Sequence, residues 1–75
     1  MYNKHVAEVY KKRFSKASIF YNQEYIFLVK GSKFVIVFCP LKQAQLDYFY
    51  IYCNGRWSKS VGYPHYNFEI RKILL

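Results

Sequence analysis

The chain has 75 residues, of which 53% are hydrophobic and 23% aromatic. These values argue against a disordered polypeptide and predict one small basic domain over residues 1–75. Twelve Lys and Arg against four Asp and Glu give a net charge of +8, which favours polyanionic partners or simply keeps molecules apart. No apolar run reaches the ~18–20 residues of a membrane span. Since no apolar segment follows the N-terminus, we expect a cytoplasmic protein.

Residues 2–14 have the periodicity of an amphipathic helix, with apolar side chains on one side and Lys and Glu mostly opposite. Asn3 is a candidate N-cap of this helix. Four cations cluster at its C-terminal end: Lys11, Lys12, Arg13 and Lys16. They suit the negative end of the helix dipole, and they suit phosphate contacts equally well.

The middle of the chain predicts a hairpin. After a short strand over residues 19–21, two β-prone runs over 25–30 and 33–39 flank Gly31-Ser32, and a glycine at the first turn position suits a type II′ turn. Both faces of this hairpin are apolar, so its strands should be covered on two sides. The N-terminal helix can cover one side. The C-terminal segment or another subunit should cover the other.

A second hairpin, over residues 46–60, has the strongest local signal in the chain. Asn54-Gly55 stands between two β-prone runs, which is typical of a two-residue hairpin turn. Its register would place Cys53 opposite Arg56, Tyr52 opposite Trp57, Tyr50 opposite Lys59 and Tyr48 opposite Val61. Pro40 ends the preceding strand because it lacks the amide that a ladder needs, and residues 40–45 should form a loop or one helical turn.

Side chains alternate across this hairpin and divide it into two faces. One face carries the Tyr/Trp/Lys set, which is Tyr48, Tyr50, Tyr52, Trp57 and Lys59; the other carries Phe49, Ile51, Cys53 and two serines. We expect the N-terminal helix to bury the second face and to leave the Tyr/Trp/Lys set outward.

The last residues are ambiguous. Residues 66–71 alternate as a strand would, whereas Ile70, Ile73 and Leu74 would also suit a short helix; we expect the strand. The chain as a whole predicts an α+β fold, in which an N-terminal amphipathic helix packs on one face of a four- to five-stranded antiparallel sheet.

The sequence lacks the usual catalytic and metal-binding patterns. The candidate nucleophiles and bases are Cys39, Cys53, His5 and His65, and none has the paired spacing of zinc ligands. The two cysteines would lie at opposite ends of neighbouring strands, too far apart to form a disulfide. We expect no metal, no cofactor and no enzymatic activity. A metal-free ribonuclease is a further alternative, and its candidate residues are Arg56, Lys59, His65 and Tyr66.

Two binding functions fit the aromatic hairpin. Proteins that hold single-stranded nucleic acid combine cations with rings on which bases stack, at about 1–3 kcal/mol per base. The Tyr/Trp/Lys set, together with Arg56 and the cations that follow the helix, therefore predicts a module that binds single-stranded RNA or DNA. Protein interfaces are enriched in the same Tyr, Trp and Arg. The alternative is a protein-interaction or inhibitor module, of the kind that viruses and mobile elements encode, with an acidic protein partner or as a homodimer.

Overall fold

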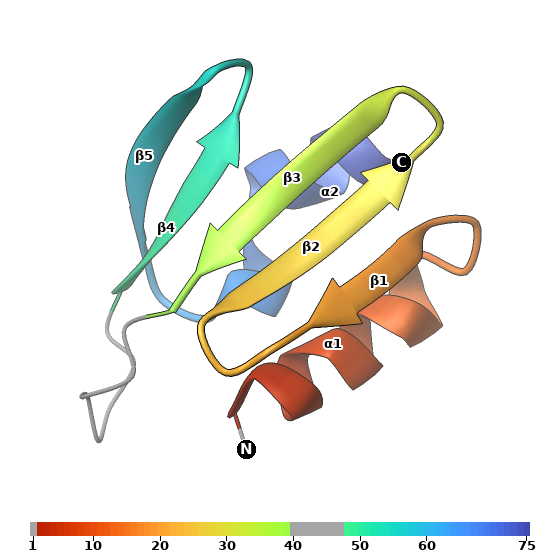
Figure 1. The fold of residues 1–75 in the computed structure, drawn as a ribbon, viewed down its shortest axis with the longest axis horizontal. Helices are drawn as coiled ribbons and strands as arrows, with labels where there is room; N and C mark the ends of the chain where they lie inside the picture. The colour runs from red at the N-terminus through yellow and green to blue at the C-terminus, as the bar shows by residue number, and fades with distance from the viewer. Residues whose placement is uncertain (1, 40–47) are drawn as a thin grey trace.

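A computed structural model describes residues 2–39 and 48–75. Its elements are helix α1 (Tyr2–Arg13), strands β1 (Ser18–Tyr21), β2 (Tyr25–Lys30), β3 (Lys33–Phe38), β4 (Tyr48–Cys53) and β5 (Arg56–Val61), the 3-10 helix η1 (Pro64–Tyr66) and helix α2 (Phe68–Leu74) (Figure 1). The strands form one antiparallel sheet in chain order. The predicted α+β fold is confirmed, with α2 as an additional helix. The predicted loop over residues 40–45 lies outside the described residues.

Both hairpins have the predicted registers. Asn54 and Gly55 have φ values of 54° and 80°, and two consecutive positive values define a type I′ turn. Gly31 has a φ of 60° while Ser32 does not share the positive sign, as a type II′ turn requires. The four pairs expected across Asn54-Gly55 are all observed, and so are the pairs that a two-residue turn at Gly31-Ser32 sets, from Lys30–Lys33 to Tyr25–Phe38. Local turn chemistry therefore determines how four of the five strands pair.

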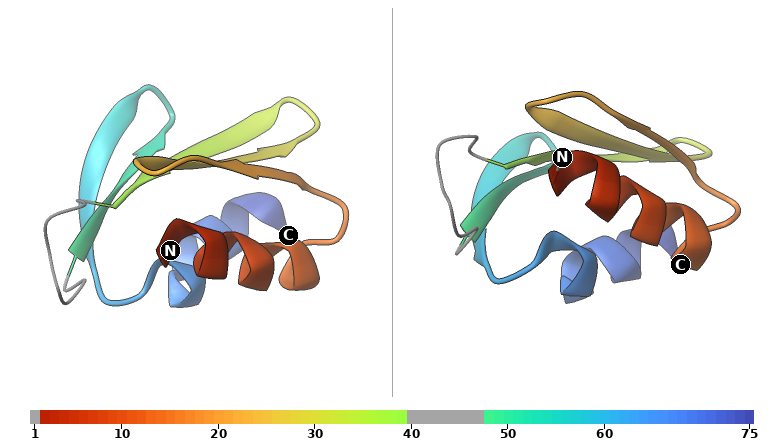
Figure 2. Two further views of the ribbon diagram at one scale, coloured as in Figure 1. Left: turned by 60° about the horizontal axis from the view of Figure 1, so that its bottom comes forward. Right: turned by 90° about the horizontal axis from the view of Figure 1, so that it is seen from below.

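The core lies between one face of the sheet and the two helices. Figure 2 shows both helices on this side, which we call the inner face. α1 packs on β1 and β2, and α2 packs on β2 and β3. The buried side chains of the sheet include Ile19, Ile26, Leu28, Val35, Val37, Phe49 and Ile51, and those of the helices are Asn3, Val6, Ala7, Tyr10, Ile70 and Leu74.

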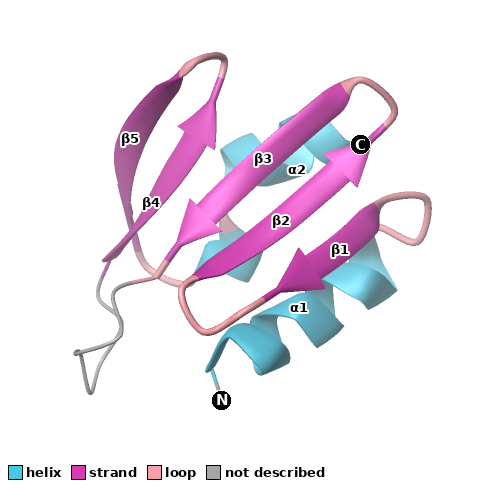
Figure 3. Cartoon of the chain, viewed as in Figure 1, coloured by secondary structure: helices cyan, strands magenta, loops and turns pink. Residues whose placement is uncertain are grey.

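The C-terminal segment is a helix, so the strand predicted over residues 66–71 is wrong (Figure 3). The side-chain oxygen of Asn67 accepts a hydrogen bond from the amide of Ile70 at 3.1 Å, which satisfies an amide that the first helical turn leaves free. Ile70 and Leu74 are both buried, four residues apart, whereas Phe68 is 74% exposed. Helical periodicity thus places the apolar residues in the core, and alternation would not.

Asn3 is not the N-cap that the sequence suggested, because it lies within α1 with its side chain buried. Its amide nitrogen donates to the carbonyl oxygens of Asn22 and Gln23, at 2.9 and 3.1 Å. The side-chain oxygen of Asn22 in turn accepts from the amides of Glu24 and Tyr25, at 2.8 and 2.7 Å. Asn3 therefore fastens the first turn of α1 to the turn between β1 and β2.

Candidate interaction surface

The face of the sheet that points away from both helices is the strongest candidate for a functional surface (Figure 2). We call it the outer face. The strand registers place on it Ser18, Phe20, Tyr25, Phe27, Val29, Phe34, Ile36, Phe38, Tyr48, Tyr50, Tyr52, Trp57, Lys59 and Val61. Nine of these fourteen side chains are aromatic, one is charged and none is acidic.

The rings of the outer face are in contact across the strands. Phe38 on β3 lies between Tyr25 on β2 and Tyr50 on β4, with ring centroids 5.2 and 6.1 Å away. The ring centroid of Trp57 on β5 lies 6.5 Å from that of Tyr25 on β2, although β3 and β4 separate these two strands. The rings of the two hairpins therefore lean toward each other. These separations are typical of favourable aromatic pairs. The outer face is therefore an ordered layer of rings.

A large part of this layer is open to solvent. Phe20, Phe34 and Trp57 are 60%, 52% and 48% exposed, and Val61 is 83% exposed. Since an aromatic side chain carries about 150–250 Å², the three rings alone leave on the order of 300 Å² accessible. The largest apolar patch of a typical monomer measures about 300–600 Å² and is often functional. The exposed aromatic cluster thus has the size of a binding surface.

No part of the described chain covers the outer face. The apolar pattern of β2 and β3 led us to expect a cover from the C-terminal segment or from another subunit. The C-terminal segment instead forms α2, which lies on the inner face beside α1 (Figure 2). The expected cover by the C-terminal segment is therefore wrong. The outer face is either covered by another molecule or exposed to solvent.

The predicted Tyr/Trp/Lys set lies together on the outer face. Tyr52 and Trp57 have ring centroids 5.4 Å apart, and the Lys59 ammonium lies 4.3 Å from the centroid of the Tyr48 ring, a cation–π contact. Sequence reasoning missed the rings that β1, β2 and β3 add to this set. The alternation in residues 25–30 and 33–38 predicts two apolar faces and favours burial of both, whereas the structure leaves one of them without a cover.

The other predicted cations lie away from the outer face. Lys11 and Arg13 belong to the last turn of α1 on the inner side, where their charges lie 5.7 Å above Tyr21 and 5.6 Å above Tyr66. Lys12 lies in the same last turn of α1, Lys16 lies in the turn that follows the helix, and Arg56 begins β5 on the inner side. The structure therefore separates most of the predicted cations from the predicted rings.

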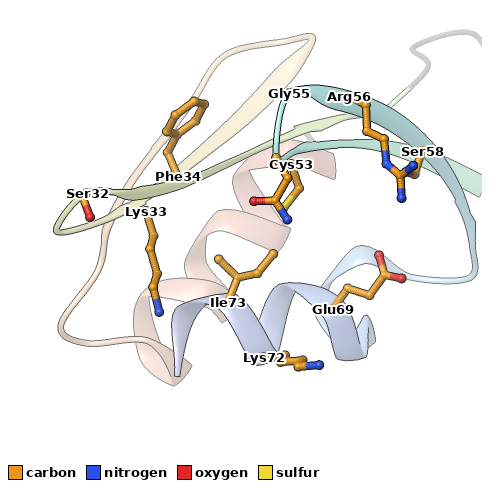
Figure 4. A pocket seen from close by; sticks show the side chains of 11 residues that line it. Ser32, Lys33, Phe34, Cys53, Gly55, Arg56, Ser58, Glu69, Lys72 and Ile73 are labelled. Carbon is orange, nitrogen blue, oxygen red and sulfur yellow. The ribbon is translucent and has the colours of Figure 1, made fainter.

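A hollow of about 590 Å³ opens between the tips of the two hairpins (Figure 4). The ladder between β3 and β4 ends at the pair Ile36–Tyr52, so the tips separate beyond it and Ile73 of α2 lines the gap. Its charged walls are Lys33, Arg56, Glu69 and Lys72. All four are exposed, so the hollow offers no enclosed polar group for a defined ligand.

A second cluster of rings joins η1 to α1. His65 is buried, with its ring centroid 4.2 Å from Tyr66, 5.7 Å from Tyr63 and 6.0 Å from His5. Its Nδ1 atom is buried without a hydrogen-bond partner in the described part of the chain. Burial first, then the neighbouring His5 and Arg13, lower the pKa of His65. His65 is therefore neutral at pH 7 and packs as part of the contact between these helices.

Acid should destabilise the protein through His65. The unfolded chain, with a histidine pKa of about 6.5, binds a proton more readily than the folded chain. Stability that is present above this pH is therefore lost as the pH falls toward the lowered pKa of the folded state. We expect the urea midpoint to fall between about pH 7.5 and about pH 5.5, and to fall less in His65→Gln.

His5→Gln is the matched control, because His5 is exposed and contributes less than burial to the lowered pKa of His65. Most of the pH dependence should remain in this variant. An equally steep decline in His65→Gln and in the wild type would contradict the assignment.

Catalytic and metal chemistry find little support elsewhere. Within residues 2–39 and 48–75, no three His, Cys, Asp or Glu side chains gather as a metal site would need. Both cysteines are free, and burial raises the pKa of Cys39 to about 12, so its thiol stays protonated. Neither α1 nor α2 has the length and apolar character that crossing a membrane requires.

No known family model, curated protein or solved structure matches this chain. Its function is therefore inferred from the chemistry of the outer face.

Proposed function

We propose that this chain is a protein-interaction module that docks a partner protein through the outer face of its sheet. The observation that carries the proposal is a layer of nine rings and one charge that no described part of the chain covers. Cores of protein interfaces are depleted in charge and enriched in aromatic side chains, and Trp and Tyr dominate their binding energy. An inhibitor of a larger protein and a homodimer both belong to this class of function.

The distribution of charge favours a protein over a nucleic acid at this face. Phosphates need Lys or Arg close to the rings that stack the bases. Lys59 is the one cation that the strands place on the outer face, and its ammonium already makes a cation–π contact with the ring of Tyr48. Binding of single-stranded RNA or DNA remains the competing proposal, supported by Lys59 among the rings and by the net charge of +8.

Photo-crosslinking from the outer face tests the proposal. Phe20 and Phe34 lie on this face and are more than half exposed, so a photoreactive phenylalanine analogue at either position should leave the core intact. On illumination of expressing cells we expect crosslinks to protein from both positions. The matched control is the same analogue at Phe68, an exposed phenylalanine of α2 on the other side, which should not give these products.

The products decide between the two classes of partner. Protease-sensitive, nuclease-resistant adducts at Phe20 and Phe34 support docking of a protein. Nuclease-sensitive adducts would support the competing proposal, in which case binding to a single-stranded oligonucleotide should weaken with salt and with Tyr50→Ala and Trp57→Ala. No adduct specific to the outer face would overturn both.

A further inference from the structure

We infer that the partner on the outer face is a second copy of this chain, so that two molecules pack outer face against outer face like the two sheets of a β-sandwich. The inference rests on the proposed function and names its partner. Three observations carry it: the nearly uncharged character of the face, the position of the charges elsewhere on the molecule, and the size of the face.

The chemistry of the face fits another face like itself. None of its fourteen side chains is acidic, and the single ammonium, on Lys59, is placed over the ring of Tyr48. A partner recognised by its charge would need further cations here, and the face has none. A layer of rings instead fits a second apolar layer, because stacked sheets interdigitate such side chains across ~10 Å. A second copy of the chain carries the same apolar layer and is present wherever the first copy is.

The cations of the two helices do not oppose this arrangement. Lys11, Lys12 and Arg13 end α1, and Arg71 and Lys72 belong to α2, so these cations lie on the helical side. In a face-to-face pair the helices form the two outermost layers. With ~10 Å between sheets and helices ~10 Å thick, the basic clusters are roughly 30 Å apart. That separation is several times the Debye length of about 8 Å at physiological salt.

The size of the face suits a dimer. Five strands about 4.8 Å apart and up to six residues long give a flat area on the order of 450 Å², and the projecting rings increase the accessible area toward the ~800 Å² per partner of a standard interface. A two-fold axis parallel to the central strand, β3, sets β5 of one copy over β1 of the other. Each Lys59 then lies over the β1 side of its partner, where Phe20 is exposed, and not over the other Lys59.

The single tryptophan of the chain reports on this interface. Trp57 lies on the outer face and is 48% exposed in one chain, so pairing should bury it. We expect light scattering at micromolar concentration to give twice the 9.1 kDa of one chain. Over the same concentration range, the emission of Trp57 should shift to shorter wavelength and become shielded from a soluble quencher.

Phe34→Lys is the decisive variant. Phe34 lies on the central strand and is 52% exposed, so the substitution spares the core and places an unpaired cation in the apolar interface. We expect self-association to weaken by roughly tenfold or more, with the emission of Trp57 returning to that of the dilute protein. Phe68→Lys makes the same exchange on α2 and should leave the dimer unchanged. Circular dichroism of both variants at low concentration should match that of the wild type and confirm the fold.

The outcomes separate this inference from the proposed function. A wild-type chain that stays monomeric with Trp57 exposed would overturn the second copy, while crosslinks from Phe20 to a protein of another mass would still support docking. A Phe34→Lys chain that remains dimeric with Trp57 shielded would place the contact elsewhere and also overturn the inference. Loss of protein crosslinks from the outer face would overturn the docking function itself.

Discussion

Phe49→Ala should unfold much of the protein, whereas Tyr50→Ala should leave it folded. Phe49 is 1% exposed on the inner face, and its cross-strand partner Ser60 is too small to fill the cavity that alanine would leave. Truncation of a buried phenylalanine costs about 3–5 kcal/mol. A domain of this size has a total stability near the lower end of about 5–15 kcal/mol, so most of it would be lost.

Tyr50 is the next residue of the same strand but lies on the outer face, opposite Lys59. Its truncation removes cross-strand contacts worth about 0.2–1 kcal/mol each and opens no internal cavity. Urea unfolding at low protein concentration measures both variants without a contribution from association. Comparable losses in the two variants would show that the two faces do not differ in burial as the structure requires.

Asn3→Asp should cost about 3 kcal/mol at pH 7, since it replaces a buried donor with a carboxylate. The amide nitrogen of Asn3 donates to the carbonyl oxygens of Asn22 and Gln23, and a carboxylate at that place would face both oxygens without a proton to share. Asn3→Ala only removes the two bonds, and about 1–2 kcal/mol should be lost. Urea unfolding should therefore rank the wild type above Asn3→Ala and Asn3→Asp last.

The ranking itself is the test. A side chain that merely capped α1 would tolerate Asp, because a carboxylate accepts from the free amides and suits the positive end of the helix. If Asn3→Asp were as stable as the wild type, the result would support a capping role for Asn3 and contradict its hydrogen bonds to the β1–β2 turn.

Local chemistry was enough to predict most of the sheet. Asn54-Gly55 and Gly31-Ser32 occupy turns whose backbone conformations suit these residues, and each two-residue turn fixes the register of its hairpin. Once the register is fixed, alternation assigns every side chain to a face. Phe49 and Ile51 are buried as expected. The expectation that the N-terminal helix covers their whole face is wrong, because α1 packs on β1 and β2, Cys53 is only half-buried and Ser58 is exposed.

The C-terminal helix and the outer face could not be predicted in the same way. Residues 66–71 satisfy both periodicities, and only the cap formed by Asn67 together with the burial of Ile70 and Leu74 decides between them. That Asn67 precedes a first-turn Glu69 was a usable signal in the sequence. The side of the sheet on which α2 packs depends on tertiary contacts. Because α2 packs on the inner face, the rings of β1, β2 and β3 stay uncovered beside the Tyr/Trp/Lys set.

The order of the strands also bears on how the chain folds. Every strand pairs with its neighbour in the sequence, so the sheet is a meander that can form by successive short loop closures. Folding rates rise as contacts become more local, because less loop entropy is lost before the contacts form. The contacts that join distant parts of the chain, such as those between α1 and η1 and the bonds from Lys30 Nζ to the carbonyls of Leu74 and Leu75, close the inner face. A chain still growing from the ribosome can thus complete its ring-bearing sheet before its last helix is available to cover the opposite side.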